Sequence, residues 1–240
     1  MIHGLKTSNC SEKMLNYKHL IYSVIIFLMM CSCSNEQVDI PDINFKNALL
    51  YSNCIDTNGD GKGDSDADTN NDNQIQLSEI KNLEFLDVSS KNIISLQGID
   101  NFTKLKYLDC YKNELVHLDV TKNTNLEVLF CFDNKLIQLD VSKNTNLIEL
   151  GCRGNKLTSL DLSQNKKLRI VYCYKNNLTT LNVKNGNNAN MSTMWAFDNP
   201  HLFSIAVNDK NTDFPLCDRE DYSGWCKDVI ASYSTETSLR

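Results

Sequence analysis

The sequence predicts a solenoid in which short coils stack and each coil adds one strand to a parallel β-sheet. The strongest observation is a repeat, because the cysteines at positions 110, 131, 152 and 173 stand 21 residues apart. Each cysteine lies two residues after an aliphatic residue and three before an asparagine, in the pattern Leu-x-x-Leu-x-Cys-x-x-Asn-x-Leu or a close variant. Such a fixed period is typical of repeat proteins, in which no single coil can bury its apolar side chains alone.

The repeated side chains fit the geometry of stacked coils. Neighbouring strands lie about 4.8 Å apart, so equal positions of successive coils form continuous columns through the core. Cysteine is small and apolar enough for a tight column. The asparagine follows the strand where the chain turns, and its amide group can both donate and accept hydrogen bonds. These asparagines are Asn113, Asn134, Asn155 and Asn176.

This pattern resembles the leucine-rich repeat family, of the internalin-like type, over roughly residues 83–207. The resemblance implies that the asparagine side chains bond to backbone groups of neighbouring turns. A weaker echo inside each coil, such as Leu118-Asp-Val120-x-x-Asn123, predicts a return segment of about ten residues. We therefore expect a leucine-rich repeat solenoid with a parallel β-sheet on one face, short extended or turn-like return segments, and a cap at each end.

The amino-terminal segment predicts a lipoprotein signal peptide. Residues 20–30 form an apolar stretch of eleven residues, which is too short to span a bilayer. The following Cys-Ser-Cys and its polar tail resemble the lipobox of Bacteroidetes-type lipoproteins, which implies a lipid on Cys33. A start at Met14 would give a short leader of the usual kind, and a buried core helix is the alternative interpretation. Cleavage before Cys33 removes three lysines and one glutamate, so the formal charge falls from −6 to −8 (−6 − 3 + 1).

The composition agrees with a single extracellular binding domain. The chain has 240 residues and a formal net charge of −6, which has the wrong sign for a nucleic-acid surface. A lipid anchor predicts that the protein lies at the outer membrane or the cell surface. The expected organisation is a signal peptide at 1–33, a tether and the start of a cap at 34–55, an acidic calcium-loop cap at 56–82, repeats at 83–207 and a carboxy-terminal cap at 208–240.

A dense acidic segment precedes the repeats. Between Asp56 and Glu79 seven acids stand against one lysine, and this density favours a bound cation or complete solvation. The last twelve residues match the spacing of an EF-hand calcium loop, which predicts a structural ion that rigidifies the cap. The predicted calcium ligands are Asp68, Asn70, Asp72, Gln74, Gln76 and Glu79.

The calcium prediction leaves alternatives open. Asn73 stands where such a loop normally has glycine, although asparagine tolerates the left-handed conformation that the turn needs. Asp56, Asn58 and Asp60 begin like a second calcium loop and also resemble thrombospondin type-3 repeats, but Ala67 occupies the twelfth position. The alternatives are therefore a second ion in this segment and a disordered linker that is merely acidic.

The cysteines of the mature chain divide into two groups. Cys217 and Cys226 flank a segment without repeat periodicity, and an oxidising compartment predicts a disulfide between them. The repeat cysteines instead predict buried free thiols, because equal positions of parallel strands have poor disulfide geometry. No Cys-x-x-Cys or paired histidine in the sequence indicates a metal site.

The strand residues that flank the buried leucine and cysteine positions are expected to point outward, because side chains alternate faces along a strand. Across five coils, eight of these fifteen residues are aromatic. Exposed aromatic surface normally marks a contact site. The predicted ligand-binding residues are Tyr107, Tyr111, Phe130, Phe132, Arg153, Tyr172, Tyr174, Trp195 and Phe197.

One coil interrupts the aromatic rows with Glu149, Gly151 and Arg153. This interruption predicts a polar point inside an apolar interface, and arginine, tyrosine and tryptophan are the residue types most frequent at binding hot spots. The alternative interpretation is that the rings stack on one another along the solenoid and stabilise it.

The sequence does not predict catalysis. The mature chain keeps only His117 and His201, and it contains no Gly-x-Ser-x-Gly, phosphate loop or zinc motif. Asp119, Asp140 and Asp161 form a column that we interpret as turn-forming residues rather than an acid-base pair. The predicted function is a non-enzymatic cell-surface binding or adhesion module that recognises a protein partner, with a glycan-binding accessory lipoprotein as the alternative.

Overall fold

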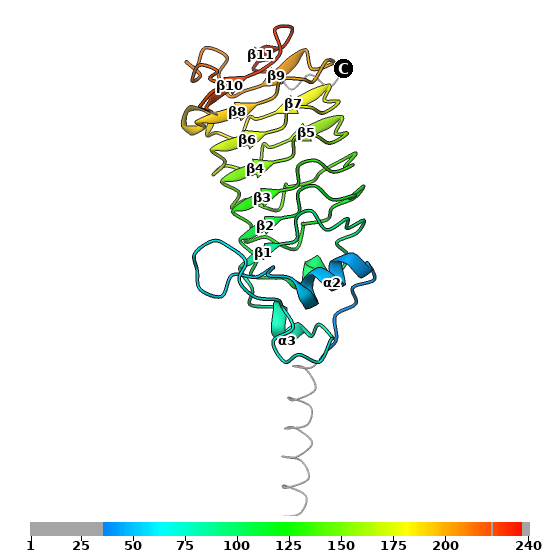
Figure 1. Ribbon diagram of the computed structural model, residues 1–240. Helices are drawn as coiled ribbons and strands as arrows, with labels where there is room; N and C mark the ends of the chain where they lie inside the picture. Colours follow the sequence, from blue (N-terminus) through cyan, green and yellow to red (C-terminus); the bar gives the residue numbers. More distant parts are fainter. Residues whose placement is uncertain (1–35, 222, 237–240) are drawn as a thin grey trace, which may run out of the picture.

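The computed structural model describes residues 36–221 and 223–236. Its coils stack along one axis, starting from a cap that contains α2 (Ile43–Tyr51) and α3 (Leu77–Ile80) (Figure 1). The chain is a parallel β-sheet solenoid, which confirms the predicted fold class. The predicted signal peptide and Cys33 lie outside the described residues. Among the helices that are described, none is long and apolar enough to cross a membrane.

The larger sheet, called here the principal sheet, has seven parallel strands of three residues each. Leu108, Leu129 and Leu150 pair in register at the centre of neighbouring strands and are fully buried. In spatial order the strands are β1 (Phe85–Asp87), β2 (Tyr107–Asp109), β3 (Val128–Phe130), β4 (Glu149–Gly151), β6 (Ile170–Tyr172), β8 (Thr193–Trp195) and β10 (Gly224–Cys226).

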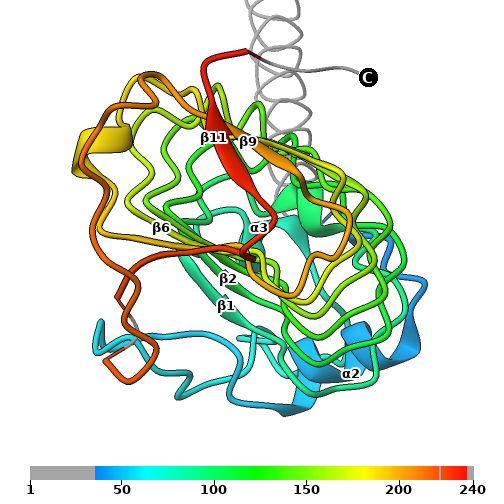
Figure 2. The same ribbon diagram turned by 90° about the horizontal axis from the view of Figure 1, so that it is seen from above.

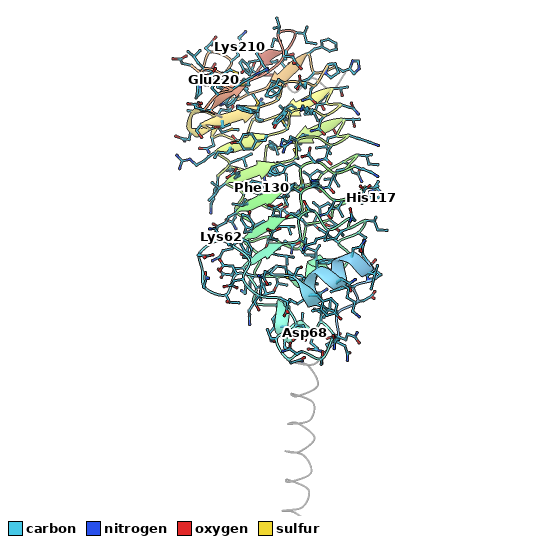
Figure 3. The ribbon with its side chains drawn as sticks, in the orientation of Figure 1. Lys62, Asp68, His117, Phe130, Lys210 and Glu220 are labelled. Atoms are coloured by element: carbon cyan, nitrogen blue, oxygen red, sulfur yellow. A yellow bond between two sulfur atoms is a disulfide. The ribbon has the colours of Figure 1, made fainter. Side chains whose placement is uncertain are left out.

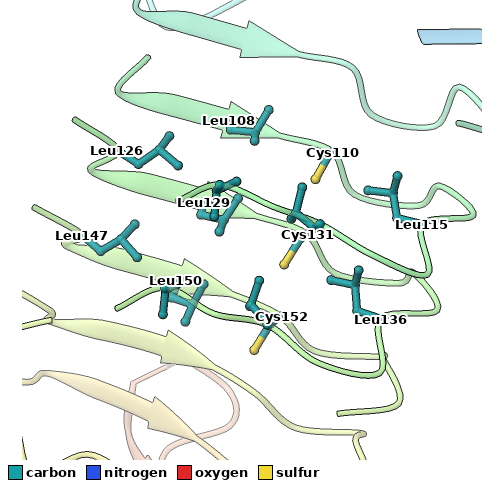
Figure 4. Close-up of a cluster of buried hydrophobic side chains, with 14 of the residues drawn as sticks. Leu108, Cys110, Leu115, Leu126, Leu129, Cys131, Leu136, Leu147, Leu150 and Cys152 are labelled. Carbon is teal, nitrogen blue, oxygen red and sulfur yellow. The ribbon is translucent and has the colours of Figure 1, made fainter. Parts of the chain in front are cut away.

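The repeat cysteines form the predicted column of buried free thiols. Figure 4 shows Cys110, Cys131 and Cys152 one above another beside the leucine columns. All of them are fully buried, and burial raises the pKa of the Cys173 thiol to about 12, so the thiols stay protonated at neutral pH. The column therefore acts as apolar packing material rather than as reactive chemistry.

The return segments are extended, as predicted, and in the later coils they pair into a second parallel sheet. Its strands, in spatial order, are β11 (Ser232–Ser234), β9 (Ser204–Ala206), β7 (Thr180–Asn182) and β5 (Ser159–Asp161). Two short 3-10 helices, η1 (Ile99–Asn101) and η2 (Asn188–Asn190), lie between strands. Viewed along the axis, each coil is a flattened loop with the two sheets on different sides (Figure 2).

Asparagine side chains join successive coils at both turns. The Asn134 amide nitrogen donates to the carbonyl oxygens of Cys110 (3.0 Å) and Cys131 (3.1 Å), and its oxygen accepts from the Leu115 amide at 3.0 Å. This arrangement confirms the role that the family resemblance implied. A second column, at Asn123, Asn144 and Asn165, donates in the same way but leaves each side-chain oxygen without a hydrogen bond.

The amino-terminal cap covers the first coil. Asp42 caps helix α2, which buries Phe45 and Leu49 against the repeats, and the Phe45 ring lies 6.4 Å from that of Phe102. This helix was not predicted from the sequence. From Glu36 onward the chain is also bonded into the cap, because the Leu77 amide donates to the Glu36 carbonyl at 2.8 Å. From Glu36 on, the segment predicted as a tether and the start of a cap therefore belongs to the cap.

The carboxy-terminal segment extends the solenoid beyond the predicted boundary at residue 207. Strands β10 and β11 pair with β8 and β9, so residues 208–236 add one further coil. Trp225 occupies the core column above Met194 and stacks on Phe214 with ring centroids 4.1 Å apart. A disulfide joins Cys217 to Cys226. This coil lacks the repeat motif, and the rings of Phe214, Trp225 and Tyr233 pack together in its interior.

The asparagine column gives a prediction for stability. Asn134→Ala leaves buried backbone groups of two coils without partners, and each such loss costs about 1–3 kcal/mol. We expect the free energy of unfolding in urea to fall by about 2 kcal/mol or more. Asn146→Ala is the control, because its exposed side chain bonds at the surface to the Thr124 carbonyl (3.1 Å) and the Lys167 ammonium (2.8 Å), and surface changes usually stay within about 0.5 kcal/mol. Equal losses in both variants would contradict this role.

Candidate functional site

The outward side of the principal sheet carries most of the aromatic side chains and is called here the aromatic face. In each strand the central residue is buried while its neighbours point away from the core. Figure 3 shows Phe130 on the side of the principal sheet and His117 on the return side. The rings of the face are Phe85, Tyr107, Tyr111, Phe130, Phe132, Tyr172, Tyr174, Trp195 and Phe197.

The rings contact one another in two groups. In the first group, Tyr107 stacks on Phe85 at 4.6 Å and meets Phe130 edge-on at 5.8 Å. In the second group, Tyr174 stacks on Phe197 at 4.6 Å, and Tyr172 meets Trp195 edge-on at 5.7 Å. The rings thus do stack along the solenoid, as the alternative interpretation held, yet those of strands β2, β3 and β6 are only half-buried.

Phe85 belongs to the first group but is missing from the predicted residues. Its position before the buried Leu86 is the equivalent of Tyr107 before Leu108, and the two coils pair residue by residue. Extending the repeat register one coil toward the amino terminus, over a spacing of 22 residues instead of 21, would have found it.

Arg153 bridges the two ring groups at the interruption. Its guanidinium carbon lies 5.0 Å from the Phe132 ring centroid and 5.6 Å from that of Tyr174, and its Nη1 lies 3.1 Å from an Asp133 carboxylate oxygen. Gly151 leaves room for the Phe132 ring, because a Cβ there would lie 1.9 Å from Phe132 Cε1. The predicted polar interruption is present, but the Phe132 ring and the Arg153 guanidinium fill it.

The carboxy-terminal segment covers one end of the aromatic face. Trp195 and Phe197 are only 4% and 7% exposed, because they pack with Cys226 and the Arg219 guanidinium lies 4.0 Å from the Phe197 ring. The prediction that these two rings are exposed is therefore wrong. Repeat periodicity could not reveal a cover that comes from a segment without repeats.

The opposite end of the face holds acidic groups. Burial and the charge of Asp87 raise the pKa of the Asp109 carboxyl to about 6, against one lowering hydrogen bond from the Tyr111 amide. Burial also raises the pKa of Glu149, which lies farther along the face in the central strand β4. Burial and the charges of these three acids raise the pKa of Tyr107. Asp109 was not among the predicted ligand-binding residues, and Glu149 was named only as part of the polar interruption.

The predicted calcium loop is folded around Asp68. The Asp68 carboxylate accepts the amide hydrogens of Asp72 (3.1 Å) and Asn73 (2.8 Å), and Asn73 has the expected left-handed φ of 62°. The Gln74 amide donates to Asp72 at 2.9 Å, and Gln76 donates through its side chain to the same carboxylate. Glu79 closes the loop by accepting from the Gln76 amide at 2.9 Å and from Asn70 at 3.3 Å.

The preceding segment has the same conformation. The Asp56 carboxylate accepts from the amides of Gly59 (2.6 Å) and Gly61 (2.8 Å), whose φ values are 79° and 80°. Asn58 accepts from the Asp60 amide at 2.8 Å. Across residues 36–236, apart from 222, no group of three His, Cys, Asp or Glu side chains could hold a metal by itself. Calcium in either loop would need amide and backbone oxygens as well.

A separate groove of about 690 Å³ lies on the return side, lined among others by His117 and Asp161. Asp119 accepts from the Thr121 hydroxyl at 2.6 Å and from the Thr121 amide at 2.9 Å, and Asp140 accepts from the Ser142 amide at 2.8 Å. These bonds lower the pKa of both carboxyls, so both stay ionised at neutral pH. This agrees with their interpretation as turn-forming residues. No Phe, Tyr or Trp side chain is among the residues that line the groove.

Comparisons with known proteins bear on the fold. No protein-family model matches the chain, and no curated protein is significantly similar to it. Among solved structures, the chain is similar to the functional domain of InlJ from Listeria monocytogenes, which includes a cysteine ladder, with TM-score 0.53 and 24% identity over 86% of this chain and 50% of that one. It is also similar to an internalin, InlF, from Listeria monocytogenes, with TM-score 0.50 and 18% identity over 71% of this chain and 52% of that one.

The chain thus spans about half the length of these two solved structures. At such identities the likeness concerns the fold, which here combines one parallel strand per coil with a buried column of cysteines. In its fold, this protein is an internalin-like leucine-rich repeat solenoid.

Proposed function

We propose that the protein is a non-enzymatic cell-surface binding module that recognises a protein partner through the aromatic face. The observation that carries the proposal is the half-buried state of Tyr107, Phe130, Tyr172 and Tyr174. The leucine and cysteine columns beneath them are complete, so these rings are not needed to fill the core. Aromatic residues around a central arginine make a typical hot-spot composition.

The arrangement of the face favours a protein over a glycan. Two of the ring contacts are edge-on, with interplanar angles of 86°, so these rings do not form one flat platform for sugar faces. Arg153, Asp133 and Glu149 add charges of both signs, which protein interfaces use to fix register. The fold resemblance adds the expectation of protein ligands.

Substitution of single rings tests this proposal. A partner is first captured from surface proteins with the fragment that starts at residue 34, and its affinity is then measured for Tyr172→Ala and Tyr111→Ala. We expect each loss of a ring to cost about 2 kcal/mol of binding free energy or more, roughly a thirty-fold loss of affinity. Ile137→Ala is the control, because its side chain is 47% exposed away from this face.

The core provides the converse control for the ring variants. Cys131→Asp places a charge in a fully buried column, so it should lower the melting temperature strongly and affect the partner only through unfolding. If the ring variants unfold while their folded fraction still binds the partner normally, the rings stabilise the fold rather than contact the partner. That outcome would refute the binding face. A glycan array run in parallel would support the glycan alternative if it alone returns a ligand that the ring variants lose.

Calcium in the loop at 68–79 is a second proposal, with a structural role in the cap. Asp68, Asp72 and Glu79 provide carboxylates, and their spacing together with the left-handed Asn73 supports the proposal. In the present arrangement Gln76 donates to Asp72, so its amide would turn to present oxygen to a cation. The loop ends at helix α3, so an ion here would brace the cap against the first coil.

Calcium binding would raise the melting temperature. Extracellular modules bind at about 10⁻⁴ to 10⁻³ M, and free calcium at a hundred times the dissociation constant would add about 2.7 kcal/mol to the free energy of unfolding. Glu79→Gln keeps the acceptor for the Gln76 amide and should lose most of this response, whereas Asp140→Asn on the return side should retain it. Equal melting temperatures of the wild type with calcium and with chelator would refute a stabilising ion.

We also propose that a lipid on Cys33 anchors the protein in a membrane, as in Bacteroidetes-type lipoproteins. The apolar stretch at 20–30 followed by Cys-Ser-Cys supports this. Mass spectrometry of the mature amino terminus should find acylated Cys33 as its first residue, and an unmodified chain that begins elsewhere would refute the anchor.

A further inference from the structure

We propose that Asp87 and Asp109, framed by the rings of Phe85, Tyr107 and Phe130, form a site for a cationic side chain, a lysine or arginine of the protein partner. The inference rests on the proposed function and deepens it, because it gives the partner a chemical feature and a place on the aromatic face. The first two strands of the principal sheet build the site.

Strand register places the two carboxylates side by side. Asp87 of β1 pairs directly with Asp109 of β2, and neighbouring strands lie about 4.8 Å apart. Asp109 is only 9% exposed, and within the described part of the chain it accepts one hydrogen bond, from the Tyr111 amide at 3.0 Å. In the same part of the chain Asp87 accepts one hydrogen bond, from the Ser89 amide at 2.9 Å. Two like charges are thus held close together in a poorly solvated place.

No cation within the described residues compensates these acids. The ion pairs there join Lys106 to Glu84, Lys135 to Glu114, and Arg153 to Asp133. A buried carboxylate without a cation or several hydrogen bonds is costly. This uncompensated charge favours a counterion from beyond the described residues, which we assign to the partner.

Another buried acid shows what a structural role looks like in this protein. Asp42 is 7% exposed, but its two oxygens accept four backbone amide hydrogens, and these bonds hold its pKa below the usual value despite the opposing effect of burial. Asp109 has one such bond and a raised pKa. Among the described residues the fold thus gives the Asp42 carboxylate four hydrogen bonds and the Asp109 carboxylate one.

The surroundings fit a lysine or arginine in particular. Ring faces attract cations, and both side chains carry an apolar stem that can pack against Tyr107 and Phe130 while the charged tip meets the acids. The acidic segment 56–66 begins two residues after Cys54, whose carbonyl oxygen accepts the Asp87 amide of β1 at 2.8 Å. Figure 2 shows this segment, in cyan, on the side of the principal sheet. Its charge adds to the attraction for a basic partner.

A basic probe tests the site directly. Fluorescein-labelled tetralysine is titrated with the purified protein and followed by fluorescence anisotropy, and tetralysine with acetylated side chains serves as the uncharged probe. The variant Asp87→Asn with Asp109→Asn should lose at least ten-fold in affinity for tetralysine. The acetylated probe should bind no variant.

A charge-matched variant separates the site from general attraction. Asp119→Asn with Asp140→Asn removes the same two charges on the return side, and each of these four acids accepts the amide of the second residue after it. This control should bind tetralysine within two-fold of the wild type. Equal losses of tetralysine affinity in both double variants would show that the effect depends only on net charge, and this would overturn the proposal. Unchanged binding in the Asp87 and Asp109 variant would also overturn it.

Two readouts keep the test decisive. Removing an unsatisfied buried charge should leave the melting temperature of Asp109→Asn equal to or above that of the wild type, so lost binding cannot be attributed to unfolding. If Tyr172→Ala lowers the affinity for a captured partner but the double variant at Asp87 and Asp109 binds that partner normally, the cationic contact is refuted and the aromatic face remains the binding surface. If neither variant lowers the affinity for the partner, the result counts against the proposed function itself.

Discussion

The rest of the structure depends on the fixed register between successive coils. Backbone hydrogen bonds set one strand directly beside the next, and asparagines such as Asn134 join each turn to the preceding coil. A coil of 21 residues is too small to have its own core, so its leucines and cysteines are stable only as members of columns. Any change in register would disconnect the leucine columns, the cysteine column and the asparagine bonds at the same time.

The same register arranges the outward side chains, with opposite consequences for rings and charges. Equal positions one strand apart bring aromatic residues into stacking distance, as with Phe85 and Tyr107. They also bring Asp87 beside Asp109, where burial and the charge of Asp87 raise the pKa of the Asp109 carboxyl. The aromatic face is therefore both a structural support and a partly exposed surface, and these two interpretations do not exclude each other. Only its acidic end carries an unfavourable arrangement that the fold does not require.

Much of the fold follows from particular residues in the sequence. The cysteine spacing identifies the coils, the alternation of side chains identifies the outward rows, and the pair Cys217 and Cys226 flanks the segment that the disulfide closes. The predicted site is less complete. Phe85 and Asp87 were missed because their coil has a spacing of 22 residues, and Trp195 and Phe197 were misjudged because a distant segment covers them. Helix α2 was missed because it lies before the repeats, where no periodic pattern identifies it.

By itself the sequence determined the quantities that repeat, namely the coil length, the buried columns and the identity of the side chains on the sheet. These are local, because each is set by the pattern within one period and by contact with an equal neighbour. Only the tertiary structure decided which outward side chains remain accessible. The carboxy-terminal coil covers Trp195 and Phe197, the glycine at 151 admits the ring of Phe132, and Arg153 closes the gap between the two ring groups. Exposure depends on what packs against a side chain from elsewhere in the chain, and a repeat motif carries no information about that contact.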